Sequence, residues 1–95
     1  LNEIRRLHRE TLTTLETAIA AFASGDRALA QQALDRKDEV HALERELYRT
    51  HLGRLQQGYK ESQETSTIHL DLLSDLERIN FHASQIGAAV LSLPK

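Results

Sequence analysis

The densest group of side chains able to do chemistry lies within fourteen positions near the C-terminal end: His69, Asp71, Asp75, Glu77, Arg78, Asn80 and His82. Asp71, Asp75, Arg78 and His82 are spaced i, i+4, i+7 and i+11, so a helix would place them on one face. Two carboxylates and an imidazole could ligate a divalent or ferric ion. The alternative, an ion pair of Arg78 with an aspartate beside a solvated His82, is favoured because no Glu/His pair at i, i+3 or His pair at i, i+4 occurs.

A second candidate face carries Lys37, His41, Glu44, Tyr48 and His51, at alternating spacings of four and three beside an apolar stripe. If His41 and Glu44 met Glu77 or Asp75 of a neighbouring helix, a mixed nitrogen and oxygen site would form between the two helices. The Lys37 ammonium would compete with a cation for the same carboxylates. The alternative is the charged flank of an ordinary bundle.

Two other histidines are expected in the core. His8 falls on the stripe between Ile4 and Leu12, where a neutral, hydrogen-bonded histidine is the usual outcome, and His51 is interpreted in the same way.

Composition excludes several classes of function. The chain has no cysteine, which rules out disulfides, thiolate metal sites and cysteine nucleophiles. A net charge of -2 and four aromatic residues argue against a nucleic-acid partner. Ser66, His69 and Asp71 are close in sequence, but helical geometry splays residues two and three apart, and no phosphate-binding glycine loop is present. We therefore expect no enzymatic activity.

Three amphipathic helices are expected to carry these residues, at residues 1–23, 27–57 and 63–91. Apolar residues recur every three or four positions in each segment. Gly25 is expected to end the first helix, Asp26 to cap the second and Ser62 to cap the third. Residues 1–95 are thus expected to form a single all-α domain, an antiparallel up-down-up three-helix bundle. Because the chain lacks methionine and begins at Leu1, we expect it to be part of a longer protein.

Residues 51–87 resemble the PhoU-like domain at the C-terminus of bacterial sodium/phosphate cotransporters. The resemblance rests on HLGRLQQG at residues 51–58 and ETSTIHLDLLSDLERIN at residues 64–80. It implies a regulatory domain on the cytoplasmic side of the inner membrane, tethered through an N-terminal transmembrane region and acting on a phosphate transporter by docking or homodimerisation. The alternatives are a free-standing PhoU-type regulator of phosphate uptake and a metal-binding helical bundle.

The same resemblance bears on metals, because some PhoU proteins bind iron or zinc clusters through a Glu/Asp-x-x-x-Asp pattern on two helices. Here the pattern begins at Glu77 but has Phe81 at its fifth position, and the matching positions before it hold Lys37 and His41. The resemblance therefore implies no resident cofactor, or a low-affinity divalent or ferric ion held by Glu77, His41 or Asp38. The apolar residues outside the main stripes provide an expected subunit contact surface: Leu70, Leu73 and Phe81.

Overall fold

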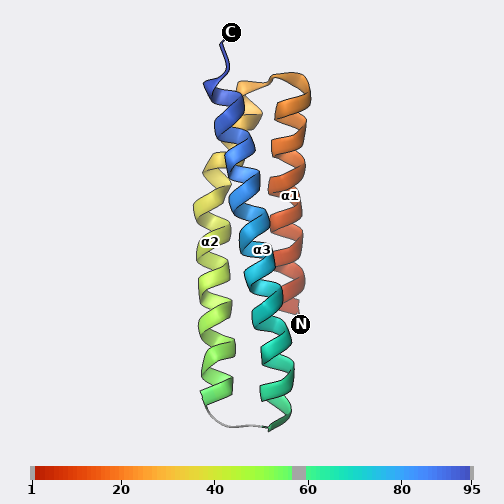
Figure 1. Ribbon diagram of the computed structural model, residues 1–95, viewed down its shortest axis with the longest axis vertical. Helices are drawn as coiled ribbons and strands as arrows, with labels where there is room; N and C mark the ends of the chain where they lie inside the picture. The colour runs from red at the N-terminus through yellow and green to blue at the C-terminus, as the bar shows by residue number, and fades with distance from the viewer. Residues whose placement is uncertain (1, 57–59, 95) are drawn as a thin grey trace.

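The computed structural model describes the backbone of residues 2–56 and 60–94 and the side chains of residues 3–53, 56 and 70–94. It contains three helices, α1 (Asn2–Ser24), α2 (Arg27–Gln56) and α3 (Lys60–Ser92), and no strand in the described part of the chain. The helices run antiparallel to their sequence neighbours and form a rod of 55 × 15 × 15 Å (Figure 1). The expected all-α three-helix bundle is confirmed.

The turn between α1 and α2 follows the expected local chemistry. Gly25 adopts a φ of 71°, which glycine tolerates without a steric penalty, and its N–H donates to the Ala21 carbonyl at 2.8 Å. Asp26 Oδ1 accepts hydrogen bonds from the N–H groups of Ala28 at 2.9 Å and Leu29 at 3.2 Å. Both predicted capping roles are confirmed.

The start of α3 differs from the expectation. The helix begins at Lys60, not at residue 63, so Ser62 lies inside it and does not cap it. The prediction followed the apolar stripe, which begins only at Ile68, whereas a helix can begin in polar residues because Lys, Glu and Gln have high helix propensity. At the end of α2 the expected residue 57 lies outside the described residues, and the observed helix ends at Gln56.

The core changes in character along the rod. Near the N-terminal end of α1 it consists of large aliphatic side chains from all three helices: Ile4, Leu7, Val40, Leu47, Leu73 and Leu76. Toward the α1–α2 turn it consists mainly of alanines: Ala18, Ala33, Ala83, Ala21 and Ala30, with Val90. Small side chains allow close approach of the helices at this end.

A polar contact joins α1 to α2 at the middle of the bundle. Arg36 interrupts the apolar stripe of α2, and its guanidinium donates to Thr14 Oγ1 at 2.9 Å and to the Glu10 carboxylate at 2.8 Å. It thereby satisfies polar groups beside the core.

None of the helices, over the residues described, contains an apolar segment long enough to cross a bilayer.

Candidate functional site

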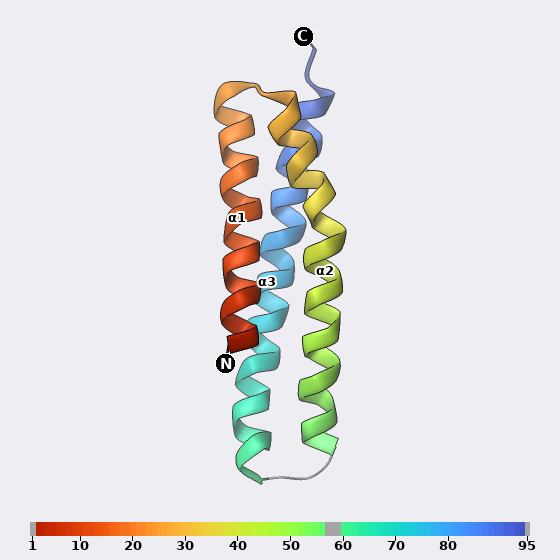
Figure 2. The same ribbon diagram turned by 180° about the vertical axis from the view of Figure 1, so that it is seen from behind.

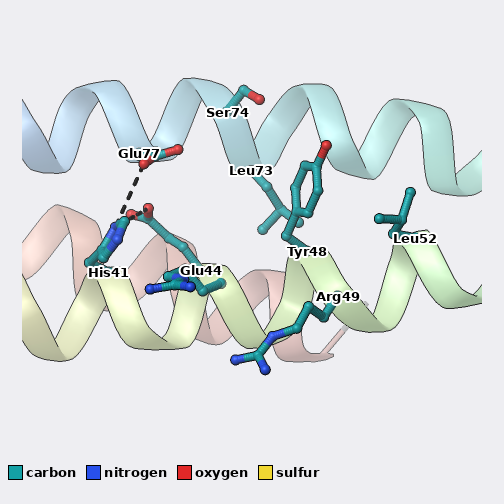
Figure 3. A pocket seen from close by; sticks show the side chains of 9 residues that line it. His41, Glu44, Tyr48, Arg49, Leu52, Leu73, Ser74 and Glu77 are labelled. Atoms are coloured by element: carbon teal, nitrogen blue, oxygen red, sulfur yellow. Dashed lines mark ion pairs between the residues drawn. The ribbon is translucent and has the colours of Figure 1, made fainter.

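A groove with a volume of about 470 Å³ lies between α2 and α3 (Figure 3). Its lining combines acidic, basic and apolar side chains: His41, Glu44, Arg45, Tyr48, Arg49, Leu52, Leu73, Ser74 and Glu77. Figure 3 shows the Tyr48 ring directed toward α3, whereas the Arg49 side chain points away from that helix. One end of the groove brings His41 together with the acidic side chains Glu44 and Glu77.

The helix register brings His41, Glu44 and Glu77 to this place. His41 and Glu44 are one turn apart on α2, and Glu44 follows the buried Val40 and precedes the buried Leu47 on the core-facing side. Glu77 extends from α3 toward them (Figure 3). One turn away, the Asn80 side-chain amide donates to the backbone carbonyl of Lys37 at 3.3 Å, which joins the two helices beside the site.

The three side chains converge on one point. His41 Nδ1 lies 3.8 Å from Glu44 Oε2 and 3.6 Å from Glu77 Oε1. One ligand atom from each residue lies within 4.8 Å of the others, which makes this trio a geometrically plausible metal site among the described residues. The His41 and Glu77 side chains are about half exposed, whereas the Glu44 side chain is only 4% exposed.

Glu44 is the unusual member of the trio. Both its carboxylate oxygens are buried and accept no hydrogen bond from the described residues. Burial raises the pKa of the Glu44 carboxyl from an ordinary 4.5 to about 7, and the nearby Glu77 carboxylate contributes to the rise. The site therefore holds one buried carboxyl group, Glu44, that has no hydrogen-bond partner among the described residues and lies near a second acid, Glu77.

The structure separates the residues that the sequence suggested as ligands. His41, Glu44 and Glu77 come together between the two helices, as one of the sequence interpretations required, whereas Asp38 does not join them. Asp38 is exposed and borders an adjoining cavity of about 160 Å³ together with Lys37 and Phe81. An acidic residue at a core-facing position of α2 is the sequence signal that distinguishes Glu44 from Asp38.

The acidic face near the end of the chain forms the expected ion pair. Arg78 donates to Asp75 Oδ1 at 3.0 Å, and both side chains are largely exposed. Asp71 and His82 are exposed as well. The side chains of Ser66 and His69 lie outside the described residues.

The two histidines expected in the core have different environments. His51 is 1% exposed, which confirms the expectation. His8 is exposed, so the expectation of a core histidine there was wrong. The apolar stripe of α1 faces inward through Ile4, Leu7 and Thr11, and position 8 falls on the flank of that stripe.

The three residues of the expected subunit contact surface differ in their exposure. Leu73 is only 2% exposed and belongs to the aliphatic core, so its prediction as a surface contact was wrong. Leu70 is partly buried against the same core, and Phe81 is 47% exposed, with its ring centroid 5.7 Å from that of His82. The sequence pattern misplaced Leu73 because the core-facing arc of α3 is wider than one line of residues.

The donor set does not fit a multinuclear iron or zinc cluster of the kind described above, in keeping with the expectation from the sequence. Two of the positions where carboxylates are required hold Lys37 and Phe81, and both side chains are exposed at the neighbouring cavity. Neither an ammonium nor a phenyl ring can bridge metal ions.

Comparison with known proteins gives consistent results. The family model described as "PhoU domain" matches residues 4–90. The protein named "Putative inorganic phosphate export protein YjbB" is 34% identical over 94 residues in Escherichia coli strain K12, in Shigella flexneri and in Salmonella typhimurium strain LT2. These matches cover 99% of this chain but only 17% of each relative, so the chain spans a small part of their length. No solved structure matches the chain significantly.

The family match extends over nearly the whole bundle, including the two helices that form the His41, Glu44 and Glu77 site. The chain belongs to the PhoU domain family.

Proposed function

We propose that this chain is a regulatory PhoU domain that controls phosphate transport through contact with a transport protein. The observation that carries the proposal is the PhoU match over residues 4–90, together with relatives named as inorganic phosphate export proteins. We propose a non-catalytic role, because a bundle of this kind can act by binding alone.

The mode of action follows from thermodynamic linkage. A domain that binds one conformation of a transporter more tightly than another shifts the transporter toward the favoured conformation. A ligand of the domain could alter transport only if its affinity differed between the docked and undocked states. Docking or dimerisation would therefore be sufficient for regulation.

Two arrangements satisfy this mechanism. As a free-standing regulator, the domain would bind its transporter in trans, and the family match supports this arrangement directly. As an accessory domain, it would share a chain with the transporter and lie on the cytoplasmic side of the inner membrane. The second arrangement is favoured by one observation: the match occupies 17% of relatives named for phosphate export.

The proposal also specifies whether the regulated transporter imports or exports phosphate and whether sodium is transported with it. The resemblance to sodium/phosphate cotransporters suggested sodium-dependent uptake, whereas the names of the relatives specify export. We therefore propose phosphate export as the regulated process and include no sodium coupling in the proposal.

The test is removal of the coding segment for residues 1–95 from the native gene. Phosphate efflux and uptake are then followed with radiolabelled phosphate in cells grown at low and high phosphate. We expect transport to persist while its dependence on the phosphate supply changes, because the domain regulates and does not carry phosphate. Transport that is unchanged under both conditions would contradict the proposal.

The two arrangements are separated by a complementation experiment. Residues 1–95, produced from a separate plasmid in the deleted cells, should restore regulation if the domain acts in trans. Failure of this complementation, with regulation restored by reinsertion at the native position, would support the accessory arrangement.

A further inference from the structure

The groove between α2 and α3 combines a buried acid, basic side chains and apolar side chains in one place. We propose that it binds a small zwitterion of the amino-acid class, with the ammonium group between Glu44 and Glu77, the carboxylate at Arg45 and an apolar side chain along the rest of the groove. The inference concerns an organic ligand and does not depend on the proposed regulation of phosphate transport.

Glu44 is the first reason to expect a positively charged group in the groove. Its side chain lines the groove but is only 4% exposed, and neither oxygen accepts a hydrogen bond from the described residues. The His41 ring does not supply one, because its Nδ1 lies 3.8 Å from Glu44 Oε2, beyond hydrogen-bond distance. A buried carboxylate is costly unless a hydrogen-bonded positive charge accompanies it.

The two acids are spaced for one ammonium group. An oxygen of Glu44 and an oxygen of Glu77 lie within 4.8 Å of each other. A nitrogen placed between them reaches both at about 2.8 Å, the usual length of a charge-assisted hydrogen bond. Because the Glu77 side chain is 56% exposed and extends from the opposite helix, it can rotate to admit the ligand without disturbing the core (Figure 3).

Arg45 offers a counter-charge for an acidic group of the ligand. It follows Glu44 directly in the sequence, lines the groove and is exposed. In an α-amino acid the ammonium and the carboxylate are attached to one carbon atom, so binding groups on consecutive residues suit them. The same guanidinium would repel a ligand with a second positive charge, such as a diamine.

The remainder of the groove suits an apolar side chain. Tyr48 and Leu52 continue the lining along α2, and Leu73 contributes to it from α3. Tyr48 is 44% and Leu52 is 37% exposed, so a ligand would cover apolar surface that water now contacts. The volume of about 470 Å³ lies within the range of about 300 to 1,000 Å³ that is usual for small-molecule sites.

The experiment is a ¹H–¹⁵N NMR titration of the chain with L-leucine in the presence of EDTA, which removes metal ions as an alternative mediator of binding. At about pH 7.5 a Glu44 carboxyl with a pKa of about 7 is mostly ionised. We expect one leucine per chain, a Kd on the order of 1 mM or tighter, and amide shifts that cluster at the groove. Shifts that do not saturate, or that lie away from the groove, would overturn the proposal.

Three analogues each lack one part of the ligand. N-acetyl-L-leucine has no ammonium group and should bind at least about tenfold more weakly, because a buried charge then stays unpaired. Glycine has no apolar side chain and should also lose at least about tenfold. L-leucinamide has no carboxylate and should bind about three- to fivefold more weakly, since an exposed ion pair contributes little. Leucinamide that binds as tightly as leucine would contradict the amino-acid class and indicate a simple amine or a polypeptide N-terminus instead.

Substitutions test the same contacts from the protein side. Glu44→Gln and Glu77→Gln should each weaken leucine binding by at least about tenfold, and Arg45→Gln by about three- to fivefold. Asp38→Asn, which alters an acid that borders the adjoining cavity, should bind leucine as the parent does. The dispersion of the amide signals in the same spectra shows whether each variant is folded. Unchanged leucine binding in folded Glu77→Gln would be decisive against the proposal.

Discussion

Glu44 is a carboxylate that the helix register places in an otherwise apolar layer. Val40 and Leu47, its neighbours on the core-facing side of α2, are 3% and 4% exposed. Transfer of a charged carboxylate into such a layer disfavours the ionised form, and the negative charge of Glu77 disfavours it further. In the absence of metal, the folded protein therefore holds a proton on Glu44 at pH values where the unfolded chain has released it.

This difference predicts that the metal-free protein loses stability as the pH rises. Below the ordinary pKa of 4.5 the carboxyl is protonated in both states, and between 4.5 and about 7 only the folded state retains the proton. Over this range the free energy of unfolding should fall by up to about 3 kcal/mol, after which it should level off. Urea denaturation in EDTA, at a series of pH values from 4 to 8, measures the change.

The variant Glu44→Gln isolates the contribution of this residue. Glutamine resembles the protonated acid, so the variant should be more stable than the parent at pH 8 and should lose most of the pH dependence. Glu46→Gln, which alters an exposed glutamate on the same helix, should behave like the parent. An equally steep pH dependence in Glu44→Gln would show that another group is responsible.

At the scale of elements, Gly87 determines how closely α3 approaches α2. A Cβ atom at this position would lie 2.9 Å from the backbone oxygen of Ala30 and 3.4 Å from the Ala33 side chain. At Gly53, within α2, a Cβ atom would have no such neighbour within 4 Å. The two glycines are both helical but differ in their tertiary surroundings.

Replacement by alanine is expected to change the stability of the protein in opposite directions at Gly53 and Gly87. Gly53→Ala should stabilise the protein by about 0.5 to 1 kcal/mol, because alanine has the higher helix propensity. Gly87→Ala gains the same propensity but must separate two helices against a backbone atom, and overpacking costs about 1 to 3 kcal/mol. We expect a net loss of stability in Gly87→Ala, measured by urea denaturation at one pH. A gain in both variants would show that the helices separate without cost.

The elements themselves were largely predictable from the sequence. The apolar spacing located all three helices, and Gly25 with Asp26 fixed the first turn. The start of α3 was not predictable because its first residues, beginning at Lys60, are polar and carry no stripe. The start of α3 depends on the helix propensity of polar residues, which leaves no apolar periodicity in the sequence.

At the scale of the whole molecule, the bundle is packed unevenly. Large aliphatic residues fill one half of the core and alanines the other. α2 and α3 continue beyond the N-terminal end of α1 in both views (Figures 1 and 2). The aliphatic half, which includes Leu7 at 0% exposure, should therefore supply most of the apolar burial that stabilises the rod.

This packing predicts a large effect of removing one buried side chain. Leu7→Ala should lower the free energy of unfolding by about 2 to 5 kcal/mol through lost burial and a residual cavity. Leu12→Ala removes the same atoms from a side chain that is 44% exposed and should cost less than about 1 kcal/mol. Thermal and urea denaturation of both variants give the comparison, and equal losses would contradict the assignment of Leu7 to the core.

The helical class, the three segments and the first turn could be read from the sequence, because they depend on local periodicity and capping. The residue types and spacing also put forward His41, Glu44 and Glu77 as candidate ligands between two helices, with Asp38 and Asp75 as alternatives. Which acid lies beside His41 and Glu77, Glu44 or Asp38, became clear only from the packed helices, as did the burial of Leu73 and the exposure of His8. These outcomes depend on the rotation of each helix about its own axis, which is set by side-chain packing among all three helices and not by the spacing within any one of them.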